Sequence, residues 1–180
     1  MTDTTEPIIK PAKLAHIVLR TADKQRLIDW WTTVFGMELQ HDAGMLAFLT
    51  YDDEHHRLAV VEMPAMHENK RTSVGLEHVA FTYDTFDDLM ATYERLKAQG
   101  ITPVAPINHG MTLSLYYADP DGNQVELQID TATVDEANAF MHSDVFAANP
   151  IGVVFDPDDL VARRKAGESV ESLVSYIPKS

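Results

Sequence analysis

Three side chains that commonly bind metal ions occupy related places in two parts of the chain. His16 is the third residue of the run Leu14–Leu19, and His78 is the third residue of the similar run Leu76–Phe81. Glu126 lies in a later stretch of alternating apolar residues. A histidine in one isolated apolar strand is more often a hydrogen-bonded core residue than a ligand, but its repetition favours a functional role. Two imidazoles and one carboxylate form a facial ligand set that suits Fe(II) or Mn(II) and leaves three positions open.

Composition limits the other kinds of chemistry. The chain has no cysteine, so a thiolate metal site, a disulfide and a cysteine nucleophile are excluded. Its formal net charge of −14 disfavours binding to nucleic acid or to an anionic membrane. No stretch approaches the roughly 20 apolar residues of a membrane span, and the N-terminus lacks the apolar core of a signal peptide. We therefore expect a cytoplasmic protein with a small-molecule ligand, and neither a nucleic acid nor a membrane as its partner.

The segments that follow the two histidine runs predict the same order of elements. Helical periodicity predicts one helix over residues 24–35 and another over residues 86–99. Gly36 and Gly100 stand where a helix C-cap is expected. The apolar face of the first helix is predicted to carry Leu27, Trp30, Trp31 and Val34. The strands predicted after the helices are residues 37–41, 44–51 and 57–63 in the first copy, and residues 102–107, 112–118 and 124–129 in the second.

Each copy is therefore a βαβββ unit, and the fold class predicted is α+β. A curved sheet with a helix on one face needs cover on the other, so we expect the two repeats to form an open, cup-shaped mixed sheet. The predicted organisation is an N-terminal arm over residues 1–12, a domain over residues 13–130 with repeats 13–63 and 75–130, and a C-terminal extension over residues 131–180. A helix is predicted near residues 134–142 of this extension, and a turn at Asp119-Pro-Asp-Gly122.

Over residues 13–130 the sequence resembles the vicinal oxygen chelate superfamily, which includes glyoxalases, bleomycin-resistance proteins and extradiol dioxygenases. The specific part of the resemblance is the two histidine runs and Tyr116-Tyr-Ala-Asp-Pro-Asp-Gly-Asn-Gln-Val-Glu126-Leu. This resemblance implies that His16, His78 and Glu126 are metal ligands. The run Asn108-His-Gly110, followed by Ser114-Leu-Tyr-Tyr117, is most similar to single-domain type I extradiol dioxygenases.

That likeness implies an Fe(II)-dependent dioxygenase that cleaves a catechol or a related aromatic diol with O₂, and it implies a homodimer. Mn(II), Zn(II) or Ni(II) could occupy the same ligands, because such donors accept several divalent ions. Tyr116 would hydrogen-bond a substrate oxygen, although its alternative role is a cross-strand aromatic in the core. His109 would be a proton donor or a substrate contact, or else a plain loop histidine.

Glu62 leaves the reaction class undecided between a dioxygenase and a glyoxalase-type enzyme. The corresponding strand of extradiol dioxygenases commonly supplies an acid–base histidine, whereas glyoxalase-type members place a fourth ligand there, usually glutamate. Glu62 is thus a catalytic base, a fourth ligand or a strand-end carboxylate in solvent. The competing functions are a glyoxalase- or epimerase-like lyase or isomerase, and a metal-free binding protein of the bleomycin-resistance kind. The adjacent His55 and His56 are interpreted as part of a hairpin turn.

Overall fold

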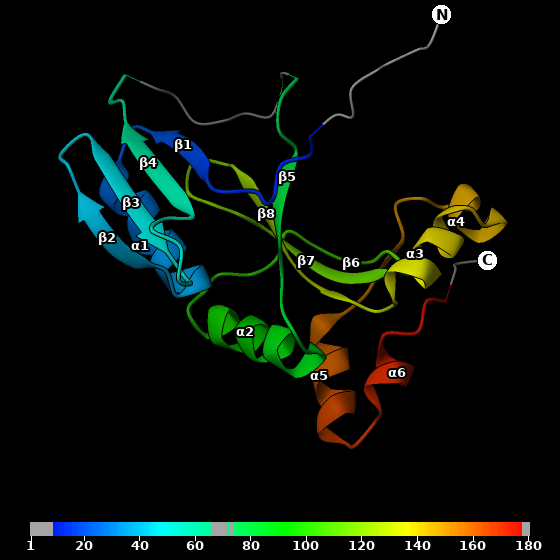
Figure 1. Cartoon of the computed structure of the whole chain (residues 1–180). Coiled ribbons are helices and arrows are strands. Elements are labelled where there is room, and N and C mark those ends of the chain that lie inside the picture. Colours follow the sequence, from blue (N-terminus) through cyan, green and yellow to red (C-terminus); the bar gives the residue numbers. More distant parts are fainter. Residues whose placement is uncertain (1–8, 66–71, 73, 178–180) are drawn as a thin grey trace, which may run out of the picture. The chain divides into compact units, whose positions relative to one another are not determined.

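The computed structural model describes residues 9–65, 72 and 74–177, which belong to two compact units over residues 1–66 and 67–180 (Figure 1). The first unit contains β1 (Ile17–Thr21), α1 (Lys24–Phe35), β2 (Glu38–Asp42), β3 (Leu46–Thr50) and β4 (Leu58–Glu62). The second begins with β5 (His78–Thr82), α2 (Phe86–Ala98), β6 (Ala105–Asn108), β7 (Thr112–Ala118) and β8 (Gln124–Asp130). It continues with α3 (Val134–Met141), α4 (Asp144–Ala148), β9 (Val153–Val154), α5 (Pro157–Lys165) and α6 (Val170–Leu173).

The predicted α+β class with two βαβββ repeats is confirmed. The first sheet has the strand order β1-β4-β3-β2 and the second has the order β5-β8-β7-β6-β9. In each sheet the first and last strands of the repeat are parallel neighbours, and the other pairs are antiparallel. Both sheets are therefore mixed and open. The predicted cup concerns the mutual arrangement of the units and stays a prediction, and most of the connection over residues 64–74 lies outside the described residues.

The core of the first unit lies between α1 and its sheet. Asp23 caps the helix by accepting a hydrogen bond from the Arg26 amide at 3.1 Å. Gly36 ends it in the left-handed conformation, with φ of 65°. The face predicted for this helix is wrong at one position, because Trp30 is only half-buried and Ile28 is buried in its place. The other buried apolar residues of α1 and β4 are Leu27, Trp31, Val34, Leu58, Ala59 and Val60.

The core of the second unit fixes which side chains face away from α2. In β7 and β8 one set of alternating residues is buried against the helix side: Leu113, Leu115, Tyr117, Val125, Leu127 and Ile129. Because successive strand residues point to opposite faces, Tyr116 and Glu126 lie on the other face. The turn that joins the two strands is the one predicted. The Gly122 amide donates to the Asp119 carbonyl at 2.9 Å, and Gly122 has φ of 83°.

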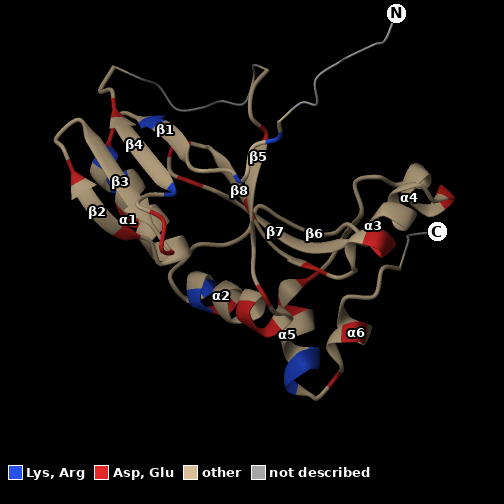
Figure 2. Ribbon diagram, in the orientation of Figure 1, with Lys and Arg blue, Asp and Glu red and all other residues tan. Residues whose placement is uncertain are grey.

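The C-terminal extension packs against the second unit in two places. Strand β9 adds to the edge of the sheet beside β6, and α5 lies along α2. Ion pairs join these helices: Lys97–Asp158 at 2.5 Å, Arg164–Asp87 at 2.7 Å and Lys165–Glu94 at 2.5 Å. The helix predicted near residues 134–142 is confirmed as α3. Figure 2 shows the basic last turn of α5 as a blue segment. Positive side chains at this place stabilise the helix, because the C-terminal end of the helix dipole is negative.

Strand β2 is the edge of the first sheet and is unlike its neighbours. All five of its residues are exposed. Its pairing with β3 is irregular, because the register shifts between Leu39 and His41.

Among the described helices, none is both long enough and apolar enough to cross a membrane.

Candidate metal centre and active site

Two of the predicted ligands come together in the second unit. β5 and β8 are parallel neighbours in which Ala80 pairs with Glu126. His78 lies two residues before Ala80 in β5 and therefore on the same face of the sheet. Nε2 of His78 is 3.0 Å from Oε2 of Glu126, and the Glu126 residue is only 5% exposed. Burial of a carboxylate is costly unless a positive charge and hydrogen bonds compensate it, so Glu126 requires a cationic or hydrogen-bonding partner at this place. Both groups are ligands that Fe(II), Mn(II), Zn(II) and Ni(II) accept.

Tyr116 joins this pair from the adjacent strand. It is the direct cross-strand partner of Glu126 in the β7–β8 ladder, which brings the two side chains close together on one face. Its ring meets the His78 ring edge-on, with the ring centroids 5.2 Å apart. Burial, the charge of Glu126 and a hydrogen bond to that carboxylate all raise the pKa of Tyr116. The phenol is therefore protonated at neutral pH and can donate a hydrogen bond.

His109 completes the group at the turn between β6 and β7. Its Nε2 is 3.0 Å from the hydroxyl oxygen of Tyr116. Burial lowers the pKa of His109, and the positive charge of a protonated His78 lowers it further. The charge of Glu126 and a hydrogen bond to the Ile151 backbone act in the opposite direction. Since burial is the largest effect, His109 favours the neutral imidazole, which carries one proton donor and one acceptor.

His16 lies in the first unit, just before β1. The neighbouring Ile17 amide donates to the Arg57 carbonyl at 3.0 Å, which extends the β1–β4 ladder to this end. The His16 ring lies 4.4 Å from the ring of His56, centroid to centroid. Burial lowers the pKa of His56, as do His16 and His55. The prediction that His55 and His56 belong to a hairpin turn is confirmed, because they lie in the bend that joins the antiparallel strands β3 and β4. Their ring centroids are 4.4 Å apart.

The two repeats differ at the position that carries Glu126. In β1 and β4, Val18 pairs with Ala59, and in β5 and β8, Ala80 pairs with Glu126. Val18 follows His16 by two residues, as Ala80 follows His78. The counterpart of Glu126 in the first unit is therefore Ala59, whose methyl group cannot bind a metal.

Glu62 lies three residues beyond Ala59 and faces α1. Its Oε1 accepts a hydrogen bond from the Lys24 amide, the first residue of that helix, at 3.1 Å. A carboxylate at this place stabilises a helix N-terminus. Taken by itself, neither unit brings together three or more histidine, aspartate or glutamate side chains that could hold one metal ion among its described residues.

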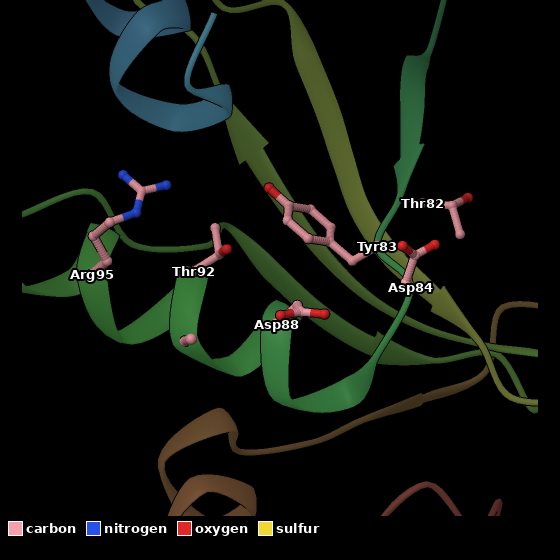
Figure 3. A pocket seen from close by; sticks show the side chains of 7 residues that line it. Thr82, Tyr83, Asp84, Asp88, Thr92 and Arg95 are labelled. Carbon is pink, nitrogen blue, oxygen red and sulfur yellow. The ribbon is translucent and has the colours of Figure 1, made fainter. Parts of the chain in front are cut away.

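A separate pocket of about 500 Å³ lies between the end of β5 and α2 (Figure 3). Its lining residues are Thr82, Tyr83, Asp84, Asp88, Ala91, Thr92 and Arg95. None of the predicted site residues is among them. Burial raises the pKa of Tyr83, which also hydrogen-bonds Thr92. The predicted ligands of this unit, His78 and Glu126, lie on the other face of the sheet, so this pocket is not the candidate site.

Comparison with known proteins agrees with this fold and this set of side chains. The family model described as "Glyoxalase/Bleomycin resistance protein/Dioxygenase superfamily" matches residues 13–127. The chain is 43% identical to biphenyl-2,3-diol 1,2-dioxygenase 2 of Rhodococcus globerulus over 166 residues, which are 91% of this chain and 87% of the relative. It is 30% identical to a lactoylglutathione lyase of Neisseria meningitidis, over 63% of this chain and 88% of the lyase. The fold of a glyoxalase/dioxygenase from Nostoc punctiforme matches with a TM-score of 0.56 and 20% identity, covering 71% of this chain and 99% of that structure.

Paired βαβββ units define the class of protein, with His16 directly before the first strand of one unit and His78 at the start of the first strand of the other. The chain belongs to the glyoxalase, bleomycin-resistance and dioxygenase superfamily.

The sequence did not reveal the segment around Ile151 as a neighbour of His109. The Asn149-Pro150 dipeptide in this segment indicates a break in the chain and nothing of its partner. The signal that would have found the contact, a strand at residues 153–154, is two residues long and has no recognisable periodicity.

Proposed function

We propose that this protein is an Fe(II)-dependent extradiol dioxygenase that cleaves the ring of an aromatic diol with O₂, and that a biphenyl-2,3-diol is its first candidate substrate. The observation that carries the proposal is the contiguous group of His78, Glu126, Tyr116 and His109 on one face of the second sheet. The similarity to a dioxygenase named for that diol, over nearly the whole chain, supports the substrate class.

The proposed metal ligands are His16, His78 and Glu126. The buried carboxylate next to an imidazole fits a divalent cation, because a cation removes the cost of leaving that charge uncompensated. The case for His16 is its place at the first strand of its repeat, equivalent to that of His78. An iron ion held by these donors would supply the redox chemistry that lets O₂ react with an aromatic diol.

Tyr116 and His109 are the proposed catalytic side chains around the substrate. The protonated Tyr116 hydroxyl would donate a hydrogen bond to a substrate oxygen and so hold its negative charge. The neutral His109 ring, in contact with that hydroxyl, would accept or return a proton. Together they would orient the diol and control one proton without adding a fixed positive charge beside the ligands.

Two observations weigh against the lyase or isomerase alternative. These enzymes would require a fourth metal ligand, a second carboxylate from the first unit. The position equivalent to Glu126 is occupied by Ala59. The carboxylate of Glu62 accepts a hydrogen bond from the first amide of α1 instead. We therefore propose that Glu62 is neither ligand nor base, but a helix-stabilising carboxylate. The metal-free binding protein is disfavoured because it would have no use for a buried Glu126 beside His78.

Three further features belong to the proposal. The enzyme is proposed to act as a homodimer in the cytoplasm. Mn(II), Zn(II) and Ni(II) are proposed to compete for the same ligands in the order of their availability and affinity. The high negative charge of the chain suits an uncharged aromatic substrate better than a phosphorylated one.

The experiment is anaerobic purification and reconstitution with Fe(II), followed by O₂ uptake with biphenyl-2,3-diol and with catechol. We expect iron-dependent uptake and a yellow ring-cleavage product, both lost in His78→Ala. His142→Ala is the matched control, since His142 is an exposed histidine at the end of α3. Tight zinc or nickel binding without oxygen uptake from any diol would move the protein to the lyase alternative.

A further inference from the structure

The C-terminal extension makes an unusually close contact with the loop that carries His109. Strand β9 pairs with β6, with Val153 opposite Asn108 and Val154 opposite Ile107. The residue before β9 is Gly152, with φ of 97°. A Cβ atom placed on Gly152 would lie 2.3 Å from the carbonyl oxygen of Asn108 and 3.0 Å from Cα of His109. Only glycine therefore allows the extension to approach the backbone of His109 so closely.

Side-chain hydrogen bonds hold this approach from both sides. The Asn149 side chain donates to the Gly152 carbonyl at 2.7 Å and accepts from the Gly152 amide at 3.2 Å. Asn108, only 7% exposed, accepts from the Gly110 amide at 2.8 Å and donates to the Val174 carbonyl at 3.0 Å. The two Asn149 bonds stiffen the turn within the extension, and the bond to Gly110 stiffens the loop. The bond from Asn108 to Val174 joins the loop to the extension, in addition to the short ladder.

The extension also packs against the other side of His109. Gly110 has φ of 88°, and a Cβ atom there would lie 2.5 Å from Cζ of Phe140 in α3. The Phe140 ring contacts the rings of Phe146 and Tyr176, at centroid distances of 5.8 and 5.5 Å. Both chain neighbours of His109, Asn108 and Gly110, therefore contact the extension.

We propose that the turn Asn149–Gly152 is a positioning element, in which the Ile151 carbonyl accepts a hydrogen bond from the His109 ring and aims its Nε2 at the Tyr116 hydroxyl. The ring and the Ile151 backbone are hydrogen-bonded, and Nε2 lies 3.0 Å from the hydroxyl. Ile151, Asn149 and Gly152 touch no reacting atom, so they act only through His109.

This arrangement selects one tautomer of His109. A neutral imidazole has a single N–H group. When Nδ1–H donates its hydrogen bond to the Ile151 carbonyl, Nε2 carries no proton and can accept a hydrogen bond from the Tyr116 hydroxyl. A phenol has a single proton, so Glu126, which also accepts from this hydroxyl, competes with His109 for it, and a bound substrate oxygen would take the place of one of these acceptors. The catalytic consequence rests on the proposed function, but the tautomer does not.

The test is ¹⁵N NMR of the histidine rings in the metal-free protein, with the His109 signals identified by their loss in His109→Gln. We expect wild-type His109 to be the Nδ1–H tautomer at pH 7.5. In Gly152→Ala it should return to the Nε2–H form that free histidine prefers, and kcat should fall about 10- to 100-fold with little change in KM. The matched control is Gly167→Ala, because Gly167 has a similar φ of 93° but nothing within 4 Å of the added Cβ.

Asn149→Ala is the second variant, because it loosens the turn without adding a steric clash and keeps the test valid if Gly152→Ala does not fold. It should shift the tautomer in the same direction, by a smaller amount. An Nε2–H tautomer in the wild type would overturn the proposal, as would a folded Asn149→Ala with unchanged His109 signals, or an equal change in Gly167→Ala. If the tautomer behaves as expected but no diol consumes oxygen, the positioning element stands and the proposed function fails.

Discussion

The two βαβββ units have the same strand order but carry different side chains at equivalent positions. Each has a histidine at the start of its first strand, yet the paired position on the last strand is Ala59 in one and Glu126 in the other. The second unit also carries Tyr116, His109 and an extension that packs on them. The difference teaches that a duplicated fold can keep its backbone register while one copy carries only a single side chain of the proposed ligand set.

The largest expected effect distinguishes two carboxylates on equivalent strands, Glu126 within β8 and Glu62 at the end of β4. Glu126→Gln keeps the size of the side chain but removes its charge. It should lower iron affinity and oxygen uptake by more than the roughly 100-fold that loss of an outer-shell partner costs. Glu62→Gln should change activity by less than about threefold, because its partner is the Lys24 amide. Iron content and O₂ uptake measure both, and similar losses in the two variants would restore Glu62 as a ligand or base.

The next two predictions compare the two faces of β7, on which Tyr116 and Tyr117 point in opposite directions. Tyr116→Phe removes the hydroxyl between His109 and Glu126. It should lower kcat by about 10- to 100-fold, the factor that corresponds to a hydrogen bond to a charged oxygen of about 1.5–3 kcal/mol. Steady-state kinetics with a saturating diol measures this. A Tyr116→Phe variant with full kcat would leave the tyrosine as a structural aromatic.

A smaller effect of opposite sign is expected from Tyr117→Phe. The Tyr117 hydroxyl is buried on the α2 side and has no hydrogen-bond partner among the described residues. Since an unsatisfied buried hydroxyl is costly, its removal should raise the free energy of unfolding by about 1 kcal/mol and leave kcat unchanged. Urea unfolding measures the first quantity. A clear loss of stability would reveal a partner for this hydroxyl.

The smallest effect concerns the contact of α5 with α2, which has no equivalent in the first unit. Hydrogen bonds from Lys97 and Tyr93 lower the pKa of Asp158. A carboxylate with a lowered folded pKa stabilises the fold above its unfolded pKa of about 4, and this contribution is lost as the pH falls through the folded value. The Tm of Asp158→Asn should therefore be slightly below that of the wild type at pH 7.

The same pair of proteins provides the pH test. The Tm values of wild type and Asp158→Asn should converge as the pH is lowered below 4. A difference that persists at pH 2.5 would mean that the side chain contributes by packing and not by charge.

The repeat and the core faces could be predicted because they depend on local periodicity. Tyr116 and Tyr117 fall on different faces by strand alternation alone, and the neighbouring strands that bring Glu126 to His78 follow from the βαβββ order. The role of Glu62 could not be predicted, because a shift of one residue along β4 decides whether a side chain faces α1 or the opposite side. The contact of Gly152 with Asn108 depends on a pairing between residues far apart in the chain, which leaves no periodic pattern.

Strand β2 has a consequence for how this protein behaves at high concentration. A regular edge strand offers a row of free amide and carbonyl groups on which another copy can grow as a continuous sheet. The register shift between Leu39 and His41 interrupts that row, and Glu38 places a negative charge at one end of the exposed strand, whereas Asp42 at the other end is paired with Lys24. Edge-to-edge aggregation through β2 is therefore opposed by both backbone geometry and charge repulsion.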